Sequence, residues 1–503
     1  MNAQNLPPEI LEHISLFIEC RPQISRCARV CRAWHATFIR SLFYKIDVQS
    51  LSCTEKKYPT GAVLGRYCHL IRSVNFQRHF PPDYLELGRQ LGSIPPTTAW
   101  QLLLQKCQLF SLIISQPHTS FSGFGSLATL ISNHASTLTE IQISFHDKSV
   151  PIITHFWNEI AQCTQLQRLT IRKGSVIGSE AEAFTQACST PTTLEIYGMS
   201  LLGGLGVDGL KWPRVKRLCC SNLLNAPAVR FVKAVISRCS NLKFLYWSMD
   251  MHGDAMRTFS EYLAANTWPL LDSLHFRSDS YLQDSELFRV LDTLTKPLVL
   301  LRAPRSDFST LSFNSMRGRG FFTSIRDLNL NRCLGVTSAM IQEILSSCPL
   351  LEVCFLGRIR ISDIICGKPW ICGRMRNLCI NIDVDSAVND PDFIEQQHKV
   401  FKQLSVMKLV EKLAINHEKT DIQSTRTLDL RLESGLGLLT GFSQLKEFWF
   451  KGDQRMTLED VHWLANNFKR LRHLSGRLHV DEEILKPLKN VLTERGISVY
   501  DGN

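Results

Sequence analysis

The sequence has few of the patterns that mark secreted, membrane-bound or disulfide-linked proteins. Among its 503 residues there is no Asn-x-Ser/Thr glycosylation site, and its 17 cysteines form no Cys-x-x-Cys pair. The first residues lack the basic and then apolar order of a secretion signal, and no apolar run reaches the ~18 residues of a membrane span. We therefore expect a soluble intracellular protein of the cytoplasm, the nucleus or both, with reduced cysteines.

Patterns for catalysis, cofactors and metals are also missing. There is no His-Glu-x-x-His among the 15 histidines, no nucleophile elbow and no phosphate-binding loop. Cys366 and Cys372 are too widely spaced for a usual zinc site, and no second pair follows them. Residues 204–209 fit Gly-x-Gly-x-x-Gly, but Pro213 and a new strand follow where the dinucleotide pattern requires a helix. We expect a protein that is not an enzyme, with no catalytic residues, no cofactor and no metal.

The overall charge narrows the choice of partners only a little. Hydrophobic residues make up 44% of the chain and charged residues 20%, which excludes a largely disordered protein. The net charge of +11 is mildly basic, so it permits an anionic partner without requiring a nucleic acid. We expect a protein partner rather than a membrane or a nucleic acid.

One apolar pattern recurs along most of the chain. It places apolar residues at i, i+3 and i+5, as in Leu166, Leu169 and Ile171, and we call each occurrence a frame. Most frames follow one another after 24–29 residues, which is the period of leucine-rich repeats. The frames begin at Ile71, Leu109, Leu138, Leu166, Pro191, Val215, Leu242, Leu271, Leu298, Ile325, Leu351, Met375, Val410, Leu445 and Leu471.

A repeat of this length has room for one strand, one turn and one returning helix. Strands stack ~4.8 Å apart and helices need about twice that width, so a stack of such repeats must curve with its strands inside. The expected fold is an α/β solenoid, a leucine-rich-repeat horseshoe with parallel strands on the concave face. We assign 71–482 to about 14–15 irregular repeats, 47–70 to a connector or N-terminal cap, and 483–503 to a C-terminal cap. Helices are expected at 150–161, 226–237, 255–265, 285–294, 338–347 and 458–468, and loops near 383–395 and 417–433.

Residues 1–46 depart from this pattern and favour three short helices with a small core, which would be marginal alone. Two motifs stand out there. Leu6-Pro7-Pro8-Glu9-Ile10-Leu11 comes first, and Val30-Cys31-Arg32-Ala33-Trp34 begins 24 residues after Leu6. This pair of motifs resembles the F-box, and the whole chain is similar to fungal F-box proteins with leucine-rich repeats.

The resemblance implies a partner and a role. F-boxes bind the Skp adaptor of SCF ubiquitin ligases, which joins them to a cullin scaffold, and the repeats of many such proteins hold a substrate. Another interpretation remains open, in which Ile10, Leu11 and Ile14 pack internally against Val30 and Trp34. The residues that would contact the adaptor by this resemblance are Leu6, Pro7, Ile10, Leu11 and Ile14.

Alternation along a strand predicts which side chains face the concave surface. If the frame residues point into the core, those at i+2, i+4 and i+6 point away from it. Aromatic residues there are candidate anchors for a partner, and arginines suit an acidic or phosphorylated segment, although such positions are often ordinary solvated strand residues. The candidates for substrate binding are Arg168, Arg172, Tyr197, Arg217, Phe244, Tyr246, His275, Arg277, Arg302, Phe355 and Trp449.

These observations lead to one principal hypothesis and two rivals. The hypothesis is a substrate-recognition subunit of an SCF-type ubiquitin ligase, which is non-catalytic and serves ubiquitin-dependent degradation of an unknown protein. The first rival is a repeat scaffold that binds the adaptor without routing its partner to degradation. The second is an RNA- or anion-binding repeat protein that uses the arginines, and a steep salt dependence of affinity would favour it.

Overall fold

The computed structural model divides the chain into two compact units, Met1–Leu242 and Lys243–Asn503, and each is described by itself. It describes residues 6–18, 21–48, 66–77, 104, 107–115, 121–145, 154–176, 178–201, 210–221, 232–248, 253–277, 282–385, 392–416, 427–452 and 454–500.

The first unit opens with three short helices, as the sequence predicts. They are α1 (Pro8–Phe17), α2 (Arg21–Cys27) and α3 (Arg32–Tyr44). Pro8 suits the first turn of α1, where the missing N–H has no helical partner. A small core of Leu11, Ile24, Ala28 and Phe38 joins the helices, and the residues packed around it are Leu6, Ile14, Ile18, Cys27, Trp34 and Leu42.

The repeat array begins inside the segment assigned to the helical domain and its connector. Helix α3 ends at Tyr44, and β1 (Lys45–Val48) follows at once and pairs in parallel with β2 (Ser73–Gln77). Phe43 is buried at this junction and stacks on Tyr67, with 4.8 Å between the ring centroids. The first strand of the parallel sheet is therefore β1, which precedes the first predicted frame at Ile71.

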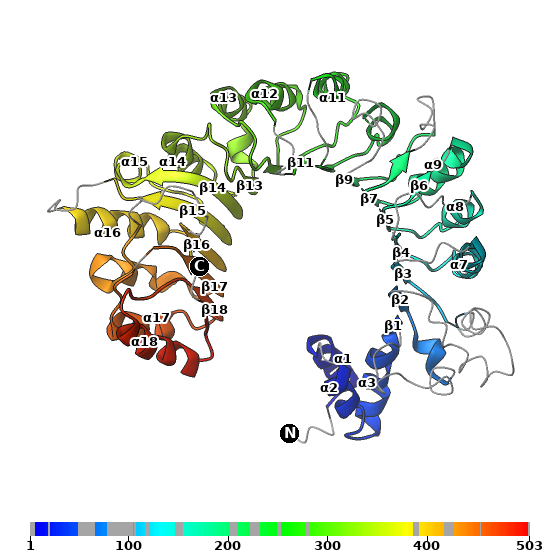
Figure 1. Ribbon diagram of the computed structural model, residues 1–503, viewed down its shortest axis with the longest axis horizontal. Helices are drawn as coiled ribbons and strands as arrows, with labels where there is room; N and C mark the ends of the chain where they lie inside the picture. Colours follow the sequence, from blue (N-terminus) through cyan, green and yellow to red (C-terminus); the bar gives the residue numbers. More distant parts are fainter. Residues whose placement is uncertain are drawn as a thin grey trace. The chain divides into compact units, whose positions relative to one another are not determined.

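The remaining strands of the first unit continue one parallel sheet. Their order is β1-β2-β3-β4-β5-β7-β9, with one strand from each repeat in regular register. Helices lie on one side of these strands and leave the other side open (Figure 1). The strands are β3 (Ser111–Ser115), β4 (Glu140–Ser144), β5 (Arg168–Arg172), β7 (Thr193–Tyr197) and β9 (Arg217–Ser221), and a separate pair is β6 (Ser175–Val176) with β8 (Ser200–Leu201). The helices are α7 (Phe121–Asn133), α8 (Thr154–Ala161) and α9 (Ala181–Ser189), with short 3-10 turns at Cys68–Leu70, Gly178–Glu180 and Ile236–Arg238.

The second unit repeats this architecture. Its strands pair in parallel in the order of the sequence, and its helices again lie on one side of them (Figure 1). The strands are β10 (Phe244–Ser248), β11 (Ser273–Phe276), β12 (Leu300–Arg302), β13 (Asp327–Asn329), β14 (Val353–Arg360), β15 (Asn377–Asp383), β16 (Lys412–Ile415), β17 (Glu447–Phe450), β18 (His473–Ser475) and β19 (Ser498–Tyr500). The helices are α11 (Asp254–Ala264), α12 (Asp284–Thr293), α13 (Thr310–Gly318), α14 (Ser338–Ser347), α15 (Ile361–Cys366), α16 (Phe393–Leu404), α17 (Leu458–Asn467) and α18 (Glu482–Glu494), with 3-10 turns at Phe321–Thr323, Leu432–Ser434 and Leu436–Gly441.

The frame residues form the core between strands and helices, which confirms the predicted leucine-rich-repeat solenoid. Leu166, Leu169 and Ile171 are fully buried, and so are the residues of the weak frame at Leu298. Helix α14 has the predicted bounds, and α8, α11, α12 and α17 lie within their predicted ranges to one residue. The expected helix at 226–237 and the loops near 383–395 and 417–433 lie partly outside the described residues. In the described part of these ranges, residues 232–234 are helical. Helix α16 begins at Phe393, which lies inside the loop expected near 383–395.

The residue at i+7 of a frame often has a left-handed backbone. Gly198 (φ 64°) and Gly452 (φ 103°) take this conformation where the chain leaves a strand, and glycine does so at no steric cost. Lys173 (φ 63°), Arg305 (φ 60°) and Arg332 (φ 58°) take it at the same position of other repeats. A side chain there costs about 1–2 kcal/mol per residue, so these three basic residues are held in a strained conformation.

Candidate interaction surfaces

One face of α1 exposes large apolar side chains. Ile10 is 48% exposed and Phe17 73% exposed, and their spacing of seven residues places them on the same side of the helix. The ring of Phe17 contacts His13 edge to face, with 5.3 Å between the centroids. Two large apolar side chains held in water on one helix face are typical of a protein-binding surface.

The residues predicted to contact the adaptor divide between this face and the core. Pro7 and Ile10 are exposed, and Leu6 and Ile14 are half-buried against the helical core. Leu11 is fully buried among the three helices, so the expectation that it contacts a partner is corrected. Phe17 lies on the same helical stripe as Ile10 and Ile14, but it was not among the residues predicted to contact the adaptor.

The open face of the strands carries the predicted substrate-binding residues. In the first unit Arg168, Arg172 and Arg217 are exposed and Tyr197 is half-buried, while the adjacent frame residues are fully buried. The structure thus places these side chains at the surface, as alternation predicts. In the second unit the predicted residues are all partly exposed, and they are Phe244, Tyr246, His275, Arg277, Arg302, Phe355 and Trp449.

The arginines of the first unit lie among acidic and aromatic side chains. Arg168 Nη1 lies 3.3 Å from Glu140 Oε1 on the neighbouring strand, and Arg172 stacks over the ring of Tyr197. The hydroxyl of Tyr197 donates to Glu195 Oε2 at 3.3 Å. Burial, helped by Cys219 and Glu195, raises the pKa of Tyr197, which therefore stays protonated and keeps this donor. The positive charge of the predicted arginines is thus partly neutralised by the Glu140 carboxylate on a neighbouring strand.

The open face of the second unit contains paired polar groups and separated aromatic rings. Tyr246 and His275 meet edge to face across β10 and β11, with 4.6 Å between their centroids. Arg302 makes a two-pronged ion pair with Asp327, at 2.9 Å from Nε to Oδ1 and 2.5 Å from Nη2 to Oδ2. Such a fork leaves little of that guanidinium for a partner.

Two aromatic residues of this face have small neighbours between them. The register of β14 to β17 aligns Phe355, Cys379, Ala414 and Trp449 in one row. Phe355 and Trp449 are three strands apart, which is about 14 Å. Because Cys379 and Ala414 are short, the two rings stand higher than the residues between them, an arrangement that suits two anchor points on one bound segment.

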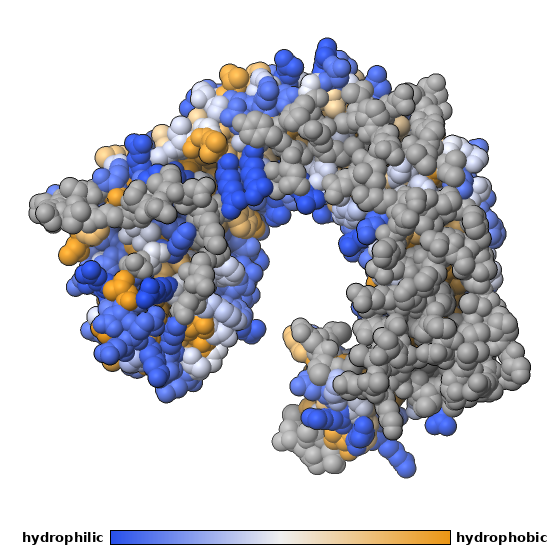
Figure 2. Space-filling view, in the orientation of Figure 1, coloured by the Kyte–Doolittle hydropathy of each residue, from blue (hydrophilic) through white to orange (hydrophobic). Residues whose placement is uncertain are grey.

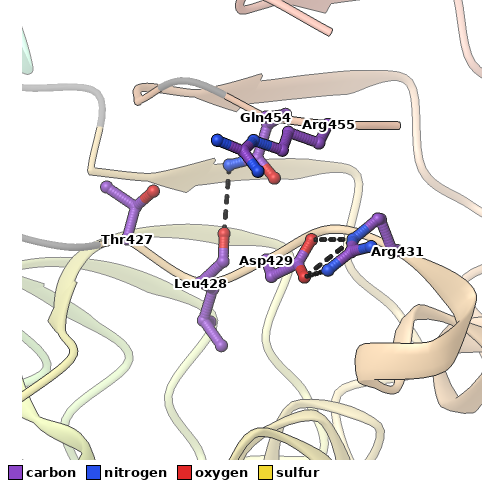
Figure 3. Close-up of a pocket in the computed structure, with 6 residues that line it drawn as sticks. All are labelled: Thr427, Leu428, Asp429, Arg431, Gln454 and Arg455. Atoms are coloured by element: carbon purple, nitrogen blue, oxygen red, sulfur yellow. Dashed lines mark hydrogen bonds and ion pairs between the residues drawn. The ribbon is translucent and has the colours of Figure 1, made fainter. Parts of the chain in front are cut away.

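A small polar cavity of about 160 Å³ lies where the chain closes an irregular repeat (Figure 3). Gln454, 3% exposed, donates to the Leu428 carbonyl at 3.0 Å and accepts from the Leu430 N–H at 2.9 Å. Asp429 pairs with Arg431, at 2.6 Å from Oδ2 to Nη2. These polar side chains thus bond one another and the backbone groups of Leu428 and Leu430.

Metal and membrane sites are not found in the part of the chain that the structure describes. There, no three His, Cys, Asp or Glu side chains come together as a metal site would require, and no helix is both long and apolar enough to span a bilayer. Cys366 is exposed and Cys372 is buried. Residues 204–209, which fit a glycine-rich pattern, lie outside the described residues.

Comparison with known proteins assigns the N-terminal helices. The model of the F-box-like family matches residues 3–49. The chain has an F-box-like domain at its N-terminus. No curated protein matches this chain. Among solved structures, the chain is similar to a leucine-rich-repeat protein of Leptospira interrogans at 12% identity, with 90% of this chain and 94% of that chain covered and a TM-score of 0.41. It is also similar to a chain of the Rad7 and Elc1 complex of yeast, at 13% identity, 76% and 91% coverage and a TM-score of 0.36.

The F-box-like domain and the repeats share one strand. The family match extends to residue 49, so it includes β1, which is also the first strand of the parallel sheet. No flexible segment separates α3 from that strand, since Tyr44 and Lys45 are consecutive. The apolar face of α1 is therefore carried on a body that is continuous with the first repeats.

Proposed function

We propose that this chain is a substrate-recognition subunit of an SCF-type ubiquitin ligase. Its F-box-like domain would dock on a Skp adaptor, and through it on a cullin, while the open strand face holds a protein substrate. The observation that carries the proposal is the exposed apolar face of Ile10 and Phe17 on an F-box-like domain fused to a repeat array. Such a subunit would act in the cytoplasm or the nucleus.

The fusion at β1 suits a receptor that contributes no catalytic group. Transfer of ubiquitin would belong to other subunits, and this chain would supply proximity and orientation, which can raise rates by orders of magnitude. A continuous α3–β1 junction, with Phe43 buried against Tyr67, would hold the adaptor at a defined position relative to the first repeats. A flexible joint would lose that advantage.

The adaptor surface can be tested with substitutions that leave the core intact. Ile10→Asp and Phe17→Asp place a charge on the exposed face of α1, and we expect each to weaken co-purification with a Skp adaptor by roughly tenfold or more. Leu334→Asp is a matched control, because Leu334 is an exposed apolar residue (92%) in the second unit. Adaptor binding that survives both α1 substitutions, with unchanged thermal stability, would refute the docking surface.

Substrate capture can be tested on the strand face. Ala414→Arg adds a long side chain between Phe355 and Trp449 without removing a core residue. Proximity labelling under proteasome inhibition should recover proteins with the parent chain that are lost with Ala414→Arg and kept with Phe17→Asp. Captured proteins that gain ubiquitin and accumulate only when the proteasome is inhibited support a receptor. Captured proteins without ubiquitin indicate the rival scaffold.

A further inference from the structure

The polar cavity of the second unit lies between two consecutive repeats (Figure 3). We call it the repeat-junction pocket, and its volume is about 160 Å³. Four of its lining residues precede β17 and two follow that strand, and they are Thr427, Leu428, Asp429 and Arg431, then Gln454 and Arg455. A molecule bound in this pocket would therefore touch both repeats.

The walls of the pocket are held in place by contacts within the chain. Gly452 has a φ of 103°, and a Cβ atom there would lie 2.5 Å from Thr427 Oγ1 and 2.8 Å from Thr427 Cγ2. Glycine is therefore needed where Thr427 meets the next repeat. Asp429 accepts from the guanidinium of Arg431 and from the hydroxyl of Ser434, the latter at 2.8 Å. The pocket is thus a formed part of the fold rather than a gap between loose side chains.

Gln454 is a buried polar side chain with an unused donor. It is 3% exposed, its Oε1 accepts the N–H of Leu430 at 2.9 Å, and its Nε2 donates to the carbonyl of Leu428 at 3.0 Å. A side-chain amide has two N–H groups, and among the described residues only one N–H of Gln454 has an acceptor. Buried donors normally have acceptors, so the second N–H points to an acceptor that the chain itself does not supply.

Two further donors line the pocket beside this amide. Arg455 makes no ion pair with the part of the chain that the structure describes, and the hydroxyl of Thr427 makes no hydrogen bond with it. Figure 3 shows the side chain of Arg455 extending across the pocket toward Thr427, with its guanidinium beside the amide of Gln454. Donors from three side chains therefore meet at one small space.

The charges of the lining favour an anion over a cation. Asp429 and Arg431 neutralise one another in a two-pronged ion pair, at 3.0 Å from Nε to Oδ1 and 2.6 Å from Nη2 to Oδ2. Arg455 then leaves the lining with a net positive charge. A metal ion such as Ca²⁺ would need several free oxygen ligands, and the only lining carboxylate is engaged with Arg431.

Exposed charge alone does not mark a site on this unit. Figure 2 shows strongly hydrophilic atoms at other places as well, such as the part where Figure 1 labels β13 and β14. The repeat-junction pocket differs because a buried amide and a charged guanidinium, those of Gln454 and Arg455, line the same small cavity.

We propose that the repeat-junction pocket binds a small molecule that carries an oxyanion, either a carboxylate or a phosphate. Its oxygens accept hydrogen bonds from Arg455, from the second N–H of Gln454 and from the hydroxyl of Thr427, and such bonds are strong when donor and acceptor are charged. A cavity of ~150 Å³ takes up a molecule as large as benzene. The pocket therefore suits a phosphate ion or a short organic acid, and it is too small for a nucleotide or a peptide segment.

Binding at this pocket goes beyond the proposed function and does not depend on it. The ligand joins two repeats through Thr427 on one side and Gln454 and Arg455 on the other. Because it binds only the folded chain, it should stabilise the second unit in proportion to its occupancy. The pocket would thus couple the stability of the array to the concentration of a small anion.

The test uses the purified full chain and measures its melting temperature and its calorimetric titration. The probes are inorganic phosphate and acetate, each at an ionic strength matched with sodium chloride, and sodium chloride alone is the reference. We expect phosphate or acetate to raise the melting temperature in a saturable way, with a dissociation constant of about 1 mM. A larger effect of phosphate identifies a phosphate ligand, and a larger effect of acetate identifies an organic acid.

Two variants separate binding from folding. Arg455→Gln removes the charge of an exposed side chain, so it should weaken binding by about tenfold or more and leave the melting temperature in chloride unchanged. Thr427→Val keeps the branched shape beside Gly452 and should weaken binding several-fold. Arg472→Gln is the matched control, because Arg472 is an exposed arginine of the same unit that does not line the pocket. It should leave binding unchanged.

A stabilisation by phosphate and acetate that is no larger than that by chloride overturns the proposal. Equal binding by the parent chain and Arg455→Gln also overturns it. An equal loss in Arg455→Gln and Arg472→Gln overturns it as well, since the anions would then respond to the overall charge of the chain. None of these measurements involves the adaptor, so the proposed function is decided separately by the Ile10→Asp and Phe17→Asp variants.

Discussion

The carboxylate of Asp284 caps the helix of the next repeat by accepting the backbone N–H of Ser309 at 2.9 Å. Asp284 is the first residue of α12, and it also accepts the N–H groups of Leu311 at 3.0 Å and Ser312 at 3.1 Å at the start of α13. One buried carboxylate thus satisfies three N–H groups that a helix end otherwise leaves unpaired. These hydrogen bonds join two consecutive repeats, in addition to the apolar packing beneath them.

Replacing Asp284 by alanine should destabilise the second unit by about 2–4 kcal/mol, because it leaves three N–H groups without their acceptor. The measurement is the midpoint of urea unfolding at neutral pH. Asp292→Ala is the control, since Asp292 is an exposed residue of the same helix. A shift equal to that of the control would show that the capping bonds contribute nothing net.

The same carboxylate predicts a loss of stability in acid. Burial alone would raise the pKa of Asp284, but the hydrogen bonds from Ser309 and Ser312 outweigh it and hold the pKa below the ordinary value of 3.8. The stabilisation is therefore complete above about pH 5 and is lost as the pH falls through about 4 towards the pKa of the folded state. The stability difference between the parent chain and Asp284→Ala should shrink over that range, and a constant difference down to pH ~3 would contradict the assignment.

Burial also divides the cysteines by reactivity. It raises the pKa of Cys163 and Cys372 to about 12 and that of Cys219 to about 11, whereas Cys366 is exposed. Because the thiolate is the reactive form, iodoacetamide should label Cys366 in the folded protein and reach the other three only after unfolding in urea. Peptide mass spectrometry measures both. Rapid labelling of Cys163 in the folded chain would show that the repeat opens locally.

Two glycines with positive φ should respond differently to alanine. At Gly476 (φ 150°) a Cβ atom would collide with the ring of Phe450, while at Gly496 (φ 76°) it would meet no atom within 4 Å. Gly496→Ala should cost about 1 kcal/mol, from backbone strain alone. Gly476→Ala should cost about 3 kcal/mol or more, because Phe450 must also move within a packed core. Equal changes in melting temperature would exclude the collision.

The solenoid could be predicted from the sequence because one frame decides the place of each strand. Three apolar positions at i, i+3 and i+5 leave the residues between them on the open face, and β17 (Glu447–Phe450) lies inside the frame that starts at Leu445. The first strand was missed, although Phe43, Ile46 and Val48 stand at i, i+3 and i+5 of the same frame. Phe43 and Ile46 lie where α3 ends, and an apolar pair at that spacing fits a helix equally well.

The candidate surfaces were predicted less completely, for two physical reasons. The stripe on α1 is wider than the small core can cover, so the pattern could not tell that Leu11 is inside and Phe17 outside. The charge of the strand face depends on neighbours far away in the sequence, as when Glu140 pairs with Arg168. Alignment of the frames by position would have placed Glu140 beside Arg168.

Under the proposed function, the junction between α3 and β1 predicts how geometry would contribute to ubiquitin transfer. A Gly-Ser linker of roughly ten residues between Tyr44 and Lys45 would separate the two bodies by ~17 Å on average and let them reorient. Adaptor binding should persist, because Ile10 and Phe17 are untouched. Ubiquitylation of the captured protein should fall several-fold, since orientation is lost while tethering is kept. The measurement is the initial rate of ubiquitin transfer in a reconstituted complex. An unchanged rate would show that tethering alone is sufficient and that the continuous junction serves only stability.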